Sequence, residues 1–137
     1  MPEYRARRKQ VAEQVSDEDL DRRCFEMRVK ATNEGLLGKT TATGYVIDEV
    51  VPFVALPAEG AKGRLVSVVN SLTGAQCYAF VLDVGPWNIN DTAYVFGGAR
   101  PEAESQPNTN GAGIDLGYKV WSLLGMKDNT EVDWWFV

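Results

Sequence analysis

The chain has 137 residues, 45% of them hydrophobic, which is enough for one domain with a buried core. After residue 30 it carries six Lys and Arg against twelve Asp and Glu. This acidic balance argues against nucleic acid as a partner, because phosphate binding needs clustered positive charge, and a neutral polysaccharide or a protein fits better.

The N-terminal segment contains no apolar stretch of the kind found in a secretory signal, and the sequence has no 18-residue apolar run that would predict a membrane span. Two alternatives for its location stay open. The protein works where it is made, in the cytoplasm or as part of a virion, or it is periplasmic after removal of a signal.

Residues 3–34 are predicted to be helical. Ser16 is a candidate N-cap, acids fill the first turn after it and bases the last turn, and Gly35 marks the end. The sequence therefore predicts a helical N-terminal arm, 1–38, followed by the main domain, 39–137. The arm either covers one side of the domain or docks on another chain.

Strand patterns begin after residue 40. Residues 41–51 predict a strand pair or a bent strand, and residues 64–70 and 77–83 predict a hairpin rich in β-branched and aromatic residues. Residues 97–112 predict a long polar loop without structure of its own.

The C-terminal part predicts a short strand over 113–115, a short helix and a closing strand over 131–137. We expect Val120, Leu123 and Leu124 to face the core and Gly125 to terminate the helix.

The two cysteines, Cys24 and Cys77, have neither metal-ligand spacing nor a disulfide framework. Two free thiols are the main prediction, and one disulfide is the alternative. We predict no metal and no cofactor. A Ser–His or Cys–His nucleophile is excluded because the chain contains no histidine.

Asp83 and Asp115 are the candidate catalytic residues. Asp83 ends the apolar run "YAFVLDV" before a Gly-Pro turn, and burial there would raise the pKa of a carboxyl group, as a general acid requires. The alternative for Asp83 is a turn residue that accepts backbone N–H groups, and for Asp115 it is a helix cap.

Candidate substrate-binding residues surround these acids. Flat aromatic faces stack on sugar rings, which favours Trp87, Tyr45 and Tyr94, and Asp91 is a further carboxylate. The adjacent Trp134 and Trp135 are expected to point to opposite faces of a strand, and Trp121 is expected in the core.

The order "TATG", "ALP", "DVGPW", "GIDLG" and "LLGM" carries a family resemblance. Over residues 40–137 the chain resembles the double-psi β-barrel of the rare lipoprotein A-like proteins, whose relatives include family 45 endoglucanases, expansins and barwin-like proteins. The resemblance implies a mainly β, six-stranded double-psi β-barrel with one short helix, and it brings Asp83 and Asp115 together beside an open groove.

In the lytic transglycosylases of that family, the aspartate at the position of Asp83 is catalytic. The family histidine is replaced here by Phe53, and the arginine after the motif aspartate by Val84. The resemblance thus implies a protein that cleaves or binds cell-wall glycan, peptidoglycan in particular, and that is degenerate as an enzyme. The alternative is a non-catalytic structural component of a larger assembly, such as a phage tail or virion.

Overall fold

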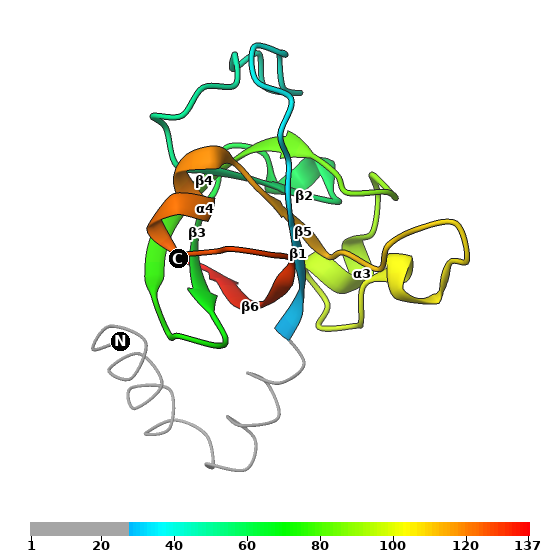
Figure 1. The fold of residues 1–137 in the computed structure, drawn as a ribbon. Helices are drawn as coiled ribbons and strands as arrows, with labels where there is room; N and C mark the ends of the chain where they lie inside the picture. The colour runs from blue at the N-terminus through cyan, green and yellow to red at the C-terminus, as the bar shows by residue number, and fades with distance from the viewer. Residues whose placement is uncertain (1–27) are drawn as a thin grey trace.

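The computed structural model describes residues 28–137, and these form a mainly β structure with few short helices (Figure 1). The elements, in chain order, are β1 Arg28–Asn33, β2 Phe53–Leu56, η1 Glu59–Ala61, β3 Leu65–Asn70, β4 Gln76–Val84, α3 Thr92–Val95, η2 Glu102–Ser105, β5 Ile114–Leu116, α4 Tyr118–Leu123 and β6 Thr130–Phe136.

The six strands in this part of the chain close into a barrel in the order β1-β5-β2-β4-β3-β6. Two neighbouring pairs, β1–β5 and β2–β4, are parallel, and the remaining pairs are antiparallel. The predicted fold class, a mainly β six-stranded barrel, is confirmed.

The barrel interior is filled by alternate residues of the strands. On β4, for example, Ala79 and Val81 are fully buried and belong to the core cluster, whereas the residues between them face outward. The other strands add mainly β-branched and leucine side chains, namely Val29, Val54, Leu56, Val66, Val68, Ile114, Leu116 and Val132.

The hairpin, the short C-terminal helix and the closing strand lie where the sequence predicted them. Leu124 is buried and Gly125, with φ of +63°, ends α4 as expected, because its N–H donates to Ser122. The prediction for Leu123 is wrong, since its side chain is 46% exposed.

The helix predicted over residues 3–34 is wrong over 28–33, because these residues form β1 and pair with β5 and β6. The barrel therefore begins before residue 39. The rest of the predicted arm, and Cys24 with it, lies outside the described residues.

The strands predicted over 41–51 are also wrong. This segment is a loop, seen in cyan at the top of Figure 1, with one isolated bridge between Thr40 and Val46. Polar side chains bond to the backbone instead: Asp48 accepts hydrogen bonds from the N–H groups of Val50 and Val51.

The segment 97–112 is more ordered than predicted. It contains η2, and Arg100 and Glu104 form a salt bridge across it. No helix within residues 28–137 is long and apolar enough to cross a membrane.

Candidate functional site

One row of residues crosses four neighbouring strands on the outer face of the barrel. Thr32 pairs with Asp115, Asp115 with Ala55, and Ala55 with Asp83. Val54, the neighbour of Ala55, points into the core, so this row points outward. The structure thus brings Asp83 and Asp115 to the same face, separated by the small side chain of Ala55.

Glu34 adds a third carboxyl group to this row. It directly follows β1, and its N–H donates to the carbonyl of Leu116 at 2.9 Å, which fixes it beside the end of β5. Burial, a hydrogen bond with Asp83, and the charges of Asp83 and Asp115 raise the pKa of Glu34 to about 9. The cluster formed by Glu34, Asp83 and Asp115 is called the carboxyl cluster below.

Glu34 holds the proton of this cluster at neutral pH. Its Oε2 atom is buried and accepts no hydrogen bond from the described residues. Burial of an unpartnered carboxyl oxygen favours the neutral, protonated form of Glu34, and the hydrogen bond between Glu34 and Asp83 acts in the same direction. The cluster therefore combines a proton donor with an acceptor.

The two aspartates are fixed by different partners. Oδ1 of Asp83 accepts from the N–H groups of Ala42 and Val84, both at 2.9 Å. Asp115 accepts from the hydroxyl of Thr32. Burial raises the pKa of Asp115, the charge of Asp83 adds to this effect, and the Thr32 hydrogen bond opposes it. Asp83 therefore accepts backbone N–H groups, as the alternative interpretation expected, but one of them comes from Ala42 in the loop after β1 and not from the Gly-Pro turn.

Trp87 is the exposed aromatic residue that the sequence predicted near the acids. Its side chain is 47% exposed, and its indole N–H donates to Oδ1 of Asn110 at 2.8 Å. It lies four residues after Asp83, beyond the Gly-Pro turn. The hydrogen bond fixes one edge of the Trp87 ring, and the exposed part of the ring leaves room for a sugar to stack against it.

Tyr45, in the loop between β1 and β2, forms an aromatic pair with Phe53, the first residue of β2. Tyr45 is half-buried and donates its hydroxyl to Asp48, and its ring meets Phe53 edge-on at 5.3 Å. Phe53 is fully buried. Tyr45 is therefore engaged in packing against the buried ring of Phe53.

Asp91 and Tyr94 lie away from the carboxyl cluster. Both are buried; Asp91 caps α3 and also accepts from the N–H of Glu102 at 2.7 Å. Tyr94 donates to the carbonyl of Gly113 and accepts from the indole of Trp134. A buried ring has no free face for a sugar, so we leave Tyr94 and Asp91 out of the proposed site.

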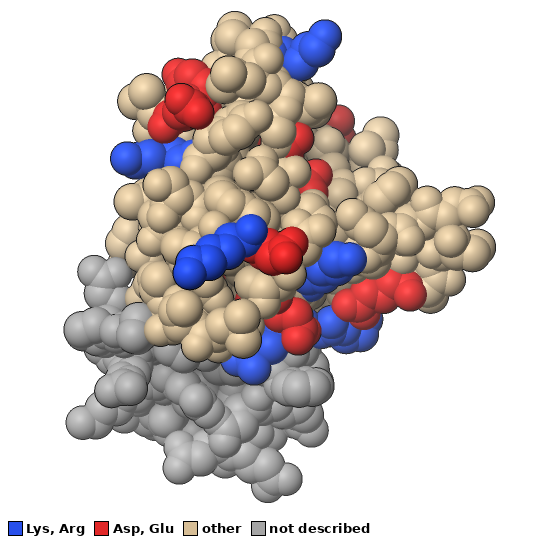
Figure 2. Space-filling model, viewed as in Figure 1, with Lys and Arg blue, Asp and Glu red and all other residues tan. Residues whose placement is uncertain are grey.

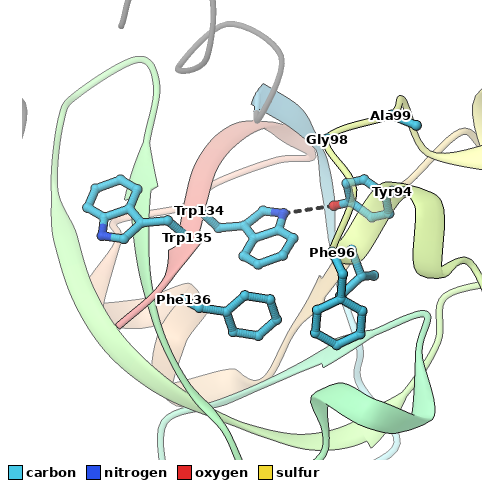
Figure 3. Close-up of a pocket in the computed structure, with 8 residues that line it drawn as sticks. Tyr94, Phe96, Gly98, Ala99, Trp134, Trp135 and Phe136 are labelled. Atoms are coloured by element: carbon cyan, nitrogen blue, oxygen red, sulfur yellow. Dashed lines mark hydrogen bonds between the residues drawn. The ribbon is translucent and has the colours of Figure 1, made fainter. Parts of the chain in front are cut away.

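Tyr94 instead borders a separate hollow of about 190 Å³ (Figure 3). Phe96 and Phe136 stack there at 5.4 Å, and the guanidinium of Arg64 lies 3.9 Å from the Phe136 ring centroid. The lining residues are Tyr94, Val95, Phe96, Gly98, Ala99, Trp134, Trp135 and Phe136, none of which belongs to the carboxyl cluster.

Glu34 is not among the residues predicted for the site, because "NEGLLGK" looks like the end of a helix and the family resemblance begins only at residue 40. The available signal was its spacing from Thr32. If residues 28–33 are recognised as a strand, alternation places Glu34 two positions on, on the same face as Thr32.

Charged side chains of both signs lie on the face of the described region that Figure 2 shows. Figure 2 shows acidic and basic side chains interspersed on one face, without a basic patch among the described residues there. Within residues 28–137, no group of three or more His, Cys, Asp or Glu side chains is arranged to hold a metal ion.

Comparisons with known proteins identify the family. The family model described as "Domain of unknown function (DUF8814)" matches residues 25–108, so the chain belongs to this family. No curated protein matches the sequence.

Solved structures resemble the barrel at low sequence identity. The Streptomyces papain inhibitor is 19% identical, with a TM-score of 0.51, over 81% of this chain and 93% of that chain. Cerato-platanin 3 from M. perniciosa is 12% identical, with a TM-score of 0.49, over 80% and 93%. The likeness to the papain inhibitor, with the strand order of the barrel, supports the double-psi β-barrel fold and does not single out the rare lipoprotein A-like proteins.

Proposed function

We propose that this barrel binds cell-wall glycan, with peptidoglycan as the first candidate, on the outer face around the carboxyl cluster. The observation that carries the proposal is that Glu34, Asp83 and Asp115 meet on one face of the barrel, where burial and the neighbouring carboxylates raise the pKa of Glu34 to about 9. Ionised carboxylates accept hydrogen bonds from sugar hydroxyls, and a protonated carboxyl donates one. Trp87, 47% exposed, supplies a ring for stacking nearby.

Co-sedimentation with purified peptidoglycan tests this binding. We expect the wild-type protein to sediment with the insoluble glycan and Trp87→Ala to lose most of this binding. Phe96→Ala is the matched control, because Phe96 is also 47% exposed but borders the separate hollow. Equal sedimentation of Trp87→Ala and wild type would exclude Trp87 from the site.

Cleavage of the glycan is the second function that we propose for this site, and the proton on Glu34 is the observation that favours it. Breaking a glycosidic bond needs an acid to protonate the leaving oxygen and a base to accept the proton of the attacking water. Glu34 would give its proton to the leaving oxygen while water adds to the anomeric carbon and passes a proton to Asp115, and Asp83, which is hydrogen-bonded to Glu34, would position the acid.

Digestion of peptidoglycan, followed by mass spectrometry of the products, tests this step. We expect new reducing ends from the wild type and none from Glu34→Gln or Asp83→Asn. If wild type binds the glycan but releases nothing, the domain is a binding module without catalysis. If it neither binds nor releases glycan, the alternative of a structural component in an assembly, such as a phage tail or virion, is favoured.

A further inference from the structure

Two exposed aromatic residues lie on β4 outside the site described above. The side chains of Tyr78 and Phe80 are 48% and 45% exposed. Ala79, between them, is fully buried in the core, so both rings stand on the outer face of the barrel. Exposed aromatic rings that lie next to each other form a contiguous apolar surface, which is a feature of binding faces.

This pair shares its face with the carboxyl cluster. β4 carries an irregularity opposite β2: Val54 pairs with Val81, but the next residue, Ala55, pairs with Asp83. The extra residue, Leu82, shifts the alternation by one position. Phe80 and Asp83 therefore both point outward although they are three residues apart.

The cross-strand partners of the two rings are uncharged. Phe80 pairs with Phe53 of β2 on one side and with Leu65 of β3 on the other. Tyr78 pairs with Ser67. A ligand on this strip would meet aromatic faces and no ionic group from these cross-strand partners, which favours a neutral ring over a charged one.

We infer that Tyr78 and Phe80 form a second sugar subsite, and that a neutral glycan chain extends along β4 from the carboxyl cluster toward Tyr78. The inference rests on the proposed glycan binding and adds the direction and extent of the bound chain. A strand rises about 3.3 Å per residue, so the distance from Tyr78 to Asp83 is roughly 15 Å, which is long enough for several sugar rings.

Binding of chito-oligosaccharides of two to six sugars, measured by titration calorimetry, tests the subsite. These are neutral β-1,4-linked amino sugars and resemble the glycan strand of peptidoglycan. For the wild type we expect affinity to increase with chain length. For Tyr78→Ala/Phe80→Ala we expect the disaccharide to bind as before and the hexasaccharide about tenfold more weakly than to wild type, which corresponds to about 1.4 kcal/mol.

Two further measurements guard against a folding defect. Tyr78→Ala alone removes an exposed ring and should weaken hexasaccharide binding in the same direction. In the unmodified protein, NMR signals of the Tyr78 and Phe80 rings should shift with the hexasaccharide and stay unchanged with the disaccharide. Phe96→Ala serves again as the control and should bind all lengths as wild type does.

The outcomes separate the two proposals. If the wild type binds neither the oligosaccharides nor peptidoglycan, the proposed function fails. If the wild type binds them, but the double variant retains the full length dependence and the Tyr78 ring signals stay unchanged, glycan binding stands and the subsite along β4 is refuted.

Discussion

At the scale of single residues, small side chains on the outer face of the barrel leave room for the larger groups beside them. Ala55 leaves room between Asp83 and Asp115, and Gly117 leaves room for the ring of Phe53. Phe53 fills the place of a catalytic histidine in the family that the chain resembles. The proposed acid–base chemistry uses the carboxyl groups, which need no histidine.

Gly117→Ala tests how tightly Phe53 is held. A Cβ atom on Gly117 would lie 2.3 Å from the Phe53 ring, and the ring is fully buried, so neither can move freely. We expect a loss of about 1–3 kcal/mol in the free energy of unfolding, as for other overpacked cores. Chemical denaturation measures it, with Ser122→Ala on the exposed side of α4 as the control. An unchanged midpoint would show that the ring has space to adjust.

Glu34→Gln tests the shifted carboxyl group through the pH dependence of stability. The folded protein keeps the Glu34 proton up to a pKa of about 9, whereas the unfolded chain loses it near the ordinary value of 4.5. Between these values the native state binds more protons, so the contribution of Glu34 to stability is complete below pH 4.5 and is lost as pH rises to 9.

We therefore expect the free energy of unfolding of the wild type to decrease with pH across this window, and that of Glu34→Gln to decrease less. Denaturant titrations at several pH values check this. Glu49→Gln, a change at an exposed glutamate in the loop before β2, should leave the wild-type slope intact. Parallel pH profiles for wild type and Glu34→Gln would contradict a shifted Glu34.

At the scale of elements, the segment from α3 to η2 is held by one buried carboxylate. Oδ1 of Asp91 accepts from the N–H of Tyr94, and Oδ2 from the N–H of Glu102. A polar side chain thus replaces the regular strand pairing that organises the rest of the chain, and it explains why the polar loop after α3 is ordered.

Asp91→Ala should lower the free energy of unfolding by about 1–3 kcal/mol, because it removes a helix cap and leaves a backbone N–H of η2 without its partner. Differential scanning calorimetry measures the loss, and Asp128→Ala, at an exposed acid, is the control. Equal stability of the two variants would mean that the Asp91 hydrogen bonds contribute no net free energy.

Elements whose pattern is set by burial could be predicted from the sequence, and elements set by local hydrogen bonds could not. In the hairpin, β3 is a buried run rich in valine and β4 alternates around the buried Ala79 and Val81, so both strands could be predicted. Residues 41–51 contain β-branched residues as well, but Asp48 bonds to its own neighbours and holds a loop. The acids and bases before β1 favoured a helix over residues 3–34, and this prediction wrongly included the residues of β1.

At the scale of the whole molecule, the candidate site exists because four strands from distant parts of the chain lie side by side in the barrel. Glu34, Asp83 and Asp115 are distant in sequence, and the two parallel pairs of the barrel bring their strands together around Ala55. The family motifs indicated Asp83 and Asp115. To predict Glu34 as a site residue, one would have to know that residues 28–33 form a strand and how it pairs with β5, and the sequence did not indicate this.

The barrel carries two separate surfaces. The carboxyl cluster and the exposed rings of Tyr78 and Phe80 share one outer face, whereas the aromatic hollow lies between α3 and β6. The proposed function uses the first surface alone. A variant in the hollow, such as Phe96→Ala, therefore serves as a control for glycan binding throughout.

The account depends most directly on the protonation of Glu34. A carbon-detected NMR titration of the carboxyl groups would measure it in the intact protein, with Glu34→Gln to assign the signal. We predict that the Glu34 carboxyl signal titrates near pH 9, so that the carboxyl cluster holds a proton at neutral pH. A Glu34 signal that titrates near 4.5 would contradict the proton donor on which the proposed cleavage rests.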